Sequence, residues 1–203
     1  MLRTNTLRTD RTGLIERLRG EGYEAEPVDG LPQAVRLPEG GDIRKADCYR
    51  QGWCVQQDGA SQLIAEILDP RPGERVLDLC AAPGIKTSHM AEKMADQGLV
   101  VALDSHPGRL RELAEGCRRM GVTVTAPVCA DASGPRHPLG SRVLFDRVLV
   151  DAPCSGLGIL RRNPEKKWRP APDFATLSNL QASLIRTAAE RVRPGGILVY
   201  STC

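Results

Sequence analysis

Apolar segments with strand character alternate with amphipathic helical segments over most of this 203-residue chain. The pattern predicts helices at 61–68, 87–97, 107–120 and from 173 onward, and strands at 75–79, 99–103, 122–126, 145–150 and 197–201. Such alternation is typical of a parallel sheet with right-handed crossovers, because each crossover returns the chain to the same edge. The sequence therefore predicts an α/β fold in this region.

The first part of the chain predicts a different arrangement, a small α+β unit over residues 1–52, with the α/β domain following over 53–203. Strand-like segments fall at 2–7, 23–28 and 34–37, and a helix is expected from a cap at Thr9 to about Arg19. Five arginines make the start of this unit, residues 1–19, basic, namely Arg3, Arg8, Arg11, Arg17 and Arg19. A solvated helix face and a surface facing nucleic-acid phosphates explain this charge equally well.

Composition narrows the class of protein. No apolar run approaches the length of a membrane span and no signal-peptide region is evident, so a cytoplasmic protein without a membrane partner is expected. The net charge of +3 permits an anionic partner without requiring one. The seven cysteines include no CxxC pair, which argues against a disulfide framework and against a zinc site. We therefore expect no metal.

The stretch 76–86, VLDLCAAPGIK, leads from a buried strand through a tight turn into a helix. Its one glycine, Gly84, cannot supply the G-x-G-x-x-G of a dinucleotide site or the spacing of a phosphate-binding loop. A nucleoside ligand without phosphates needs neither device, and S-adenosylmethionine is such a ligand. Lys86 opposes the dipole of the helix that it begins, which indicates either an anionic partner or a side chain reaching into water.

Polar groups recur where the predicted strands end. Asp104 follows the turn by about 20 residues, where a carboxylate can accept both ribose hydroxyls; it could instead cap the next helix. Asp131 could bind an adenine amino group or be an ordinary loop aspartate. Asp151-Ala-Pro-Cys154 and Thr202-Cys203 bring two thiols to the same edge. Cysteine is a strong nucleophile, although free cysteines more often serve in packing.

A basic segment, Arg161 to Arg169, contains one tryptophan, Trp168. Phosphate contact combined with base stacking is one interpretation, and a solvated surface loop is the other. The segment alone does not decide between them.

Three motifs together resemble the RNA cytosine-5 methyltransferases, and most closely the bacterial ribosomal RNA small subunit methyltransferase B type. They are Asp78–Gly84 with Lys86-Thr87, Asp151–Gly156, and Ser201–Cys203; segments 2–7, 55–61 and 161–165 are also similar. The resemblance spans nearly the whole chain. It implies a class I (Rossmann-like) methyltransferase sheet, preceded by a small RNA-contacting subdomain and apparently truncated after its fifth strand.

The resemblance also implies roles for individual residues. S-adenosylmethionine is expected to contact Cys80, Ala81, Ala82, Pro83, Gly84, Ile85, Lys86, Asp104, Asp131 and Asp151. Cys203 is the implied nucleophile, adding to carbon 6 of a cytosine that has been unstacked from its neighbours. Asp151 is expected to hydrogen-bond the base, Cys154 to help release the product, and Lys86 to belong to the catalytic group. The expected partner is RNA, specifically ribosomal RNA, and the expected oligomeric state is a monomer.

One departure from the family pattern supports an alternative. Ile85 stands where the family usually has a second glycine, and its branched side chain is expected to crowd the cofactor. With the truncation, this favours a catalytically inactive, methyltransferase-like RNA-binding protein or fragment. An amino-group methyltransferase fits less well, because those enzymes favour Asn/Asp-Pro-Pro-aromatic where this chain has Asp151-Ala-Pro-Cys154.

Overall fold

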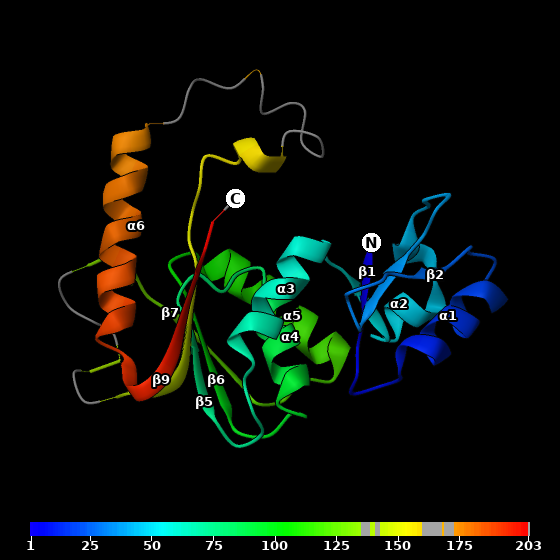
Figure 1. Ribbon diagram of the computed structural model, residues 1–203, viewed down its shortest axis with the longest axis horizontal. Coiled ribbons are helices and arrows are strands. Elements are labelled where there is room, and N and C mark those ends of the chain that lie inside the picture. The colour runs from blue at the N-terminus through cyan, green and yellow to red at the C-terminus, as the bar shows by residue number, and fades with distance from the viewer. Residues whose placement is uncertain (135–138, 141–142, 160–167, 169–172, 203) are drawn as a thin grey trace.

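The computed structural model describes residues 1–134, 139–140, 143–159, 168 and 173–202. Figure 1 shows a small N-terminal unit lying beside a larger domain whose central sheet is flanked by helices.

The N-terminal unit is built on an antiparallel sheet of order β2-β3-β1-β4. Its strands are β1 (Leu2–Thr4), β2 (Glu26–Pro27), β3 (Ala34–Arg36) and β4 (Cys54–Gln56), and its helices are α1 (Arg11–Gly20), the 3₁₀ turn η1 (Ile43–Lys45) and α2 (Asp47–Arg50). Because β4 pairs with β1, this sheet extends past residue 52. Leu14 and Leu18 of α1 pack with Leu2 and Val35 of the sheet in one core.

The cap of α1 differs from the prediction. Asp10, not Thr9, precedes the helix, and its carboxylate accepts a hydrogen bond from the Gly13 backbone N–H at 2.7 Å. A carboxylate at this position also faces the positive end of the helix dipole, which explains why aspartate serves as the cap.

The larger domain contains a five-stranded, entirely parallel sheet of order β7-β6-β5-β8-β9. The strands are β5 (Arg75–Asp78), β6 (Leu99–Asp104), β7 (Thr125–Cys129), β8 (Phe145–Asp151) and β9 (Val192–Ser201). The chain builds outward from β5 to β7 and then crosses to β8 on the other side of β5. The predicted parallel α/β sheet is confirmed, and its strands end together at one edge, where such folds bind ligands.

Helices cover both faces of this sheet (Figure 1). One face carries α3 (Gly59–Leu68), α4 (Ile85–Lys93) and α5 (Pro107–Met120), and the other carries α6 (Phe174–Ala189). Two aliphatic cores result. Met90 and Leu113 pack with Val76 and Val100 on the first face, whereas Leu184 packs with Val148 on the second. No helix in the described part of the chain is long and apolar enough to cross a bilayer.

Several predicted boundaries shift. Strand β7 begins at Thr125, not at 122, because pairing with β6 sets its register and brings Asp104 opposite Cys129. Helix α4 ends at Lys93, since Ala95 and Asp96 adopt left-handed backbone conformations. The spacing of apolar residues predicts one stripe on the helix that begins after Asp173, formed by Leu177, Leu180, Leu184, Ala188 and Val192; Val192 instead belongs to β9, because α6 ends at Ala189.

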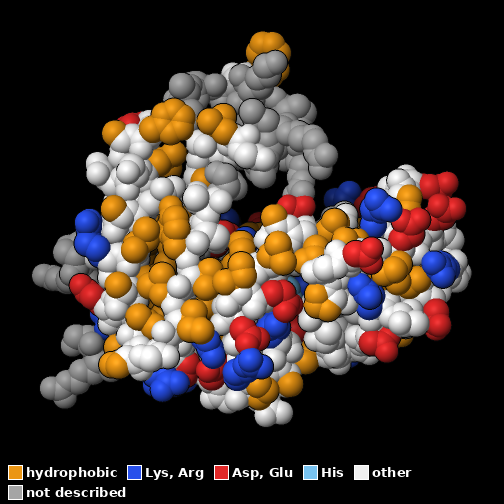
Figure 2. All heavy atoms as spheres, in the orientation of Figure 1, with side chains coloured by type: hydrophobic (Ala, Val, Ile, Leu, Met, Phe, Trp, Pro, Cys, Tyr) orange, Lys and Arg blue, Asp and Glu red, His pale blue; other side chains and the backbone are white. Residues whose placement is uncertain are grey.

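Strand β9 forms one edge of the large sheet, and exposed apolar side chains lie beside it. Figure 2 shows apolar side chains gathered over β9 and α3 on the viewer's face. The exposed members on these two elements are Leu63, Ile67, Ile197 and Tyr200. This face therefore contrasts with the N-terminal unit, where charged side chains predominate in the same view.

Candidate active site

A cavity of about 330 Å³ opens at the carboxyl ends of the parallel strands. The turn after β5, the junction of β6 and α5, the loop after β7, the end of β8 and one side of α6 form its walls. Its lining is Leu79, Cys80, Ala82, Asp104, Ser105, His106, Arg109, Ala130, Asp131, Ala132, Asp151, Ala152, Pro153, Cys154, Leu180 and Leu184. This volume lies within the range of small-molecule sites.

The turn that follows β5 is held by its backbone on one side of the cavity. The Ala82 N–H donates to Asp104 Oδ2 at 3.1 Å, and the Ala82 carbonyl accepts from Arg109 Nη2 at 2.5 Å. The Ala81 N–H donates to the Leu103 carbonyl at 3.0 Å, and the Ala82–Pro83 peptide is cis. Both polar groups of Ala82 are thus fixed by the β6–α5 junction.

Gly84 closes the turn in a conformation that other residues rarely adopt. Its φ is +95°, and a Cβ on it would lie 2.6 Å from Leu113 Cγ of α5. Glycine is required here because the turn packs directly against α5. Gly84 itself does not line the cavity, nor do Ala81, Pro83, Ile85 and Lys86 among the other predicted turn residues.

The side chain of Ile85 packs against the first core, and its carbonyl accepts a hydrogen bond from Arg3 Nη1 at 2.8 Å. The crowding of the cavity that the sequence predicted is not observed, because the branched side chain is taken up by the core. The isoleucine that stands in place of the family's glycine is therefore accommodated by the first core.

Asp151 is held from two directions at the end of β8. Lys86 Nζ, from α4, forms an ion pair with its Oδ2 at 2.5 Å, and the Ser201 hydroxyl, from β9, donates to its Oδ1 at 2.7 Å. Residues from three separate elements therefore meet at this carboxylate. Lys86, whose partner the sequence left open, pairs with a protein carboxylate in this structure.

Asp78, at the end of β5, is buried beneath this group. Its Oδ2 accepts a hydrogen bond from the Thr87 hydroxyl at 2.8 Å. In the described part of the chain its Oδ1 has no hydrogen-bond partner. Burial raises the pKa of Asp78 to about 7, because the charged form loses its hydration, although the Thr87 hydroxyl acts in the opposite direction. A carboxyl that changes charge near neutral pH thus lies under the turn.

Replacing Asp78 by asparagine should remove a pH dependence of stability. Between pH 3.8 and about 7 the folded protein keeps a proton that the unfolded chain releases, so this carboxyl costs stability increasingly as the pH rises through that window. The difference corresponds to at most about 4 kcal/mol. Urea unfolding of the cofactor-free wild type and Asp78→Asn between pH 5 and 8 should show the variant gaining relative stability toward pH 8.

The matched control for this measurement is Asp131→Asn. The Ser133 hydroxyl and N–H lower the pKa of Asp131, so this exposed carboxyl is already ionised at pH 5. Its variant should differ from wild type by a constant amount over the same range. A constant difference for Asp78→Asn as well would contradict the assigned pKa.

Three further predicted cofactor residues line the cavity. Asp104 is buried and faces the cavity, and its Oδ1 accepts the N–H of His106, the residue before α5, at 3.0 Å. It does not cap α5, because no side chain in the described part of the chain caps that helix. Asp131 lies on the loop after β7. Burial, together with nearby carboxylates, raises the pKa of the Cys80 thiol to about 12. Cys80 therefore contributes a neutral wall and no nucleophile.

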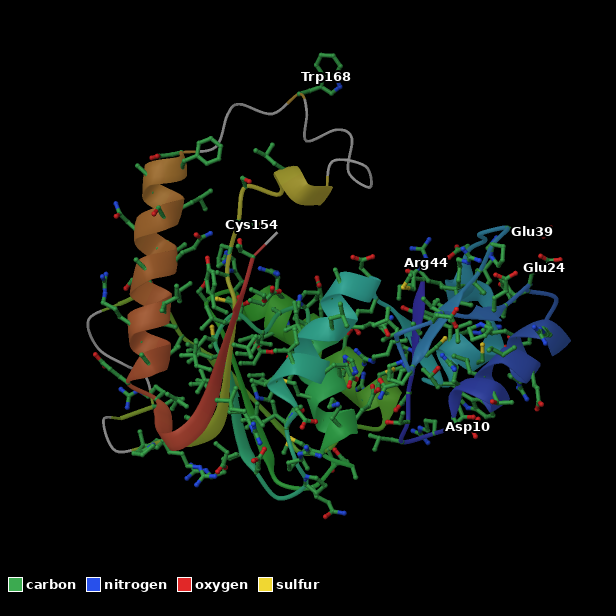
Figure 3. The ribbon with its side chains drawn as sticks, viewed as in Figure 1. Asp10, Glu24, Glu39, Arg44, Cys154 and Trp168 are labelled. Atoms are coloured by element: carbon green, nitrogen blue, oxygen red, sulfur yellow. The ribbon has the colours of Figure 1, made fainter. Side chains whose placement is uncertain are left out.

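Of the remaining groups that the sequence predicted, Cys154 lines the cavity, and most of the others lie outside the described residues. Figure 3 shows Cys154 beyond the end of β8. Cys203 lies outside the described residues, as does the basic segment except for Trp168. That side chain is 85% exposed and projects away from the body of the molecule (Figure 3). In the described residues no group of three or more His, Cys, Asp or Glu side chains could hold a metal ion.

Sequence reasoning missed several cavity residues. Ser105, His106 and Arg109 follow the strand-end aspartate of β6, and Leu180 and Leu184 come from α6. The signal for the first group was Pro107, which fixes the start of α5 directly after Ser105 and His106 and two residues before Arg109. The α6 residues read only as part of an apolar stripe.

Neither predicted explanation of the basic N-terminal unit applies to Arg3. Its side chain is completely buried and paired with Glu92 of α4. Two of the other arginines bind backbone within the unit, because Arg11 donates to the Val28 and Leu31 carbonyls and Arg19 to the Ala25 carbonyl. Part of the unit's positive charge thus serves its own structure.

A parallel sheet of this order, with a nucleoside-sized cavity at its carboxyl edge and an acid at the end of β6, is the arrangement of a class I methyltransferase or of a dinucleotide-binding domain. Comparison with known proteins makes the assignment narrower. Residues 65–203 match the family described as 16S rRNA methyltransferase RsmB/F, and residues 1–44 match the ferredoxin-like domain of RsmF/B-like methyltransferases. The chain belongs to the RsmB/F family, and the expected membership of the RNA cytosine-5 methyltransferases is confirmed.

Individual relatives agree with this assignment. The chain is 43% identical to the probable ribosomal RNA small subunit methyltransferase B of Synechocystis sp. and 41% identical to that of Bacillus subtilis, covering 100% of itself and 46% and 45% of those proteins. It thus spans about half the length of these relatives. A solved methyltransferase homologue from Pyrococcus horikoshii is 34% identical with a TM-score of 0.86, over 100% of this chain and 63% of that one. The predicted fold class and S-adenosylmethionine as cofactor are confirmed.

Proposed function

We propose that this chain contains the catalytic centre of an enzyme that methylates carbon 5 of a cytosine in ribosomal RNA. The observation that carries the proposal is the meeting of Lys86, Asp151 and Ser201 beside the cavity, with Cys154 on its rim. The relatives named as ribosomal RNA methyltransferases supply the substrate class. We assign RNA contact to the N-terminal unit, and we expect the protein to act as a monomer in the cytoplasm.

The residues present fit S-adenosylmethionine. The fixed turn supplies Cys80 and Ala82 to the cavity wall, Asp104 would accept the ribose hydroxyls, and Asp131, on the same cavity, would meet the adenine amino group. Asp78 adds a buried oxygen without a partner among the described residues. When bound, the cofactor supplies an electrophilic methyl group. Asp151 would stand at the methyl-transfer end of the cavity, held there by Lys86.

In the proposed mechanism the Cys203 thiolate adds to carbon 6 of a flipped-out cytosine, and the electron pair of the ring double bond makes carbon 5 nucleophilic. Asp151 hydrogen-bonds the base and assists its protonation during this addition. After methylation a base accepts the proton from carbon 5, the electron pair of that bond restores the ring double bond, and the carbon–sulfur bond breaks so that Cys203 leaves as the thiolate. Cys154, on the rim of the cavity, assists this release.

The inactive alternative loses its main support, because Ile85 packs against the core and leaves the cavity open. Nothing else in the described residues favours it over an enzyme.

Mass spectrometry of nucleosides from ribosomal RNA tests the proposal. RNA from cells lacking the gene should lose one 5-methylcytosine, and the purified full-length protein with S-adenosylmethionine should restore it. Asp151→Asn should reduce this restoration by about a hundredfold or more, since it removes the charge that Lys86 binds and the group that assists addition. Unchanged 5-methylcytosine in the deletion strain, or methylation at another atom, would contradict the proposed reaction.

A further inference from the structure

Arg3 of β1 is a fully buried cation at the contact between the N-terminal unit and α4. Its side chain and that of Glu92 are both 0% exposed, and Arg3 Nη2 lies 2.6 Å from Glu92 Oε1. The two residues are separated by 89 positions in the chain. Arg3 lies in β1 of the N-terminal sheet, and Glu92 lies in α4, which packs on the large sheet. Arginine is expensive to bury, so its place here calls for an explanation beyond general packing.

All five N–H groups of Arg3 have acceptors. Nε and Nη2 donate to the two oxygens of Glu92 at 3.2 and 2.6 Å, and Nη2 also donates to Ser88 Oγ at 2.9 Å. Nη1 donates to the Ile85 carbonyl at 2.8 Å and to the side-chain oxygen of Gln57. Only the planar fork of a guanidinium can serve this many acceptors at once, and the ammonium of lysine cannot.

Two of these bonds, to the Ile85 carbonyl and to Ser88 Oγ, reach the first turn of α4 directly after the cofactor turn, whereas the bonds to Glu92 reach the last turn of the same helix. Ile85 and Ser88 stand on either side of Lys86, whose Nζ pairs with Asp151 at 2.5 Å. Gly84, which precedes α4, has no side chain and therefore cannot cap the helix with one. Ser88 Oγ in turn donates to the Ile85 carbonyl at 3.1 Å. Arg3 therefore holds the start of α4, which directly follows the turn that supplies Cys80 and Ala82 to the cavity.

We propose that Arg3 is a positioning residue for the cofactor site. It fixes the start of α4, and through it both the turn that ends at Gly84 and the ammonium of Lys86. No residue of the N-terminal unit lines the cavity in the described part of the chain. The unit would nevertheless set the affinity for the cofactor, because its β1 strand supplies Arg3. This inference rests on the proposed function only in placing the cofactor at this turn.

Isothermal titration of the full-length protein with S-adenosylhomocysteine tests this role without RNA. Arg3→Lys keeps the positive charge but cannot reach all the acceptors, and it should weaken binding at least tenfold. The matched control is Arg119→Lys at the far end of α5, about 15 Å along the helix from Arg109. Arg119 also joins the two parts of the molecule, donating to the Tyr49 and Cys54 carbonyls. Arg119→Lys should be less stable than wild type, yet its Kd for S-adenosylhomocysteine should stay within twofold of the wild-type value.

Ser88→Ala provides a milder variant, which matters if Arg3→Lys fails to fold. It removes one of the five acceptors and should weaken binding severalfold with nearly unchanged melting temperature. In the Arg3→Lys background the same substitution should add little, because both act through one turn. Wild-type affinity in folded Arg3→Lys or in Ser88→Ala would overturn the inference, as would equal weakening in Arg119→Lys. Since methyl transfer is not measured, this failure is distinct from failure of the proposed reaction.

Discussion

Replacing Cys203 by alanine is expected to abolish 5-methylcytosine formation by the full-length protein. Without the thiolate, no bond forms at carbon 6 of the base, and carbon 5 is then too weakly nucleophilic to accept a methyl group. Loss of a covalent nucleophile typically costs on the order of a thousandfold or more in rate. The measurement is nucleoside mass spectrometry of ribosomal RNA after incubation with enzyme and S-adenosylmethionine.

The control for this variant is cofactor binding. Cys203 lies outside the described residues, but Ser201, two positions earlier, pairs with Asp151 across β8 and β9 and bonds to it directly. Because Cys203 is proposed to act on the base and not on the cofactor, S-adenosylhomocysteine should bind Cys203→Ala as it binds wild type. Methylation that persists in a variant with normal binding would remove Cys203 from the mechanism.

Replacing Cys154 by alanine is expected to trap the enzyme on its RNA. Cys154 follows Asp151 in the lining of the same cavity, beside the carboxylate that is proposed to hold the base. If it assists release, its loss should leave the bond between Cys203 and carbon 6 intact. A protein–RNA species that survives denaturation should then accumulate on gels, while multiple turnovers fall to about one per enzyme molecule.

Cys129→Ala is the matched control for this experiment. Cys129 is an exposed thiol at the end of β7 that lies outside the cavity lining. This variant should turn over like wild type without accumulating the adduct. Normal turnover by Cys154→Ala, or an equal amount of adduct with Cys129→Ala, would exclude the release role.

The sequence predicted the elements whose ends carry local signals. Helix α5 has the predicted bounds because Pro107 begins it and Gly121 ends it in a left-handed conformation. Strand β7 was placed too early, since its neighbour β6 sets the register and Val122 is buried before the strand starts. Pairing between strands is a long-range property, so a local apolar pattern could not locate that boundary.

In the candidate site, too, the residues with a local sequence signal were predictable, and their long-range partners were not. Asp104 and Asp151 were predictable because parallel strands end at one edge. The partners that hold them, Arg109 through the Ala82 carbonyl and Ser201 through its hydroxyl, depend on side-chain directions after folding. Arg3 was the largest surprise, because a basic residue near the N-terminus gives no indication that its acceptors lie on a helix 82 or more residues away.

The central claim is that the thiol of Cys203 and the carboxylate of Asp151 serve one cytosine beside the cofactor cavity. The most direct test is to incubate the full-length protein and S-adenosylmethionine with RNA carrying 5-azacytosine, which blocks release, and to map the attached nucleotide by peptide mass spectrometry. The account predicts attachment to the peptide containing Cys203, lost in Cys203→Ala and strongly reduced in Asp151→Asn. Attachment to another cysteine, or attachment indifferent to Asp151, would contradict it.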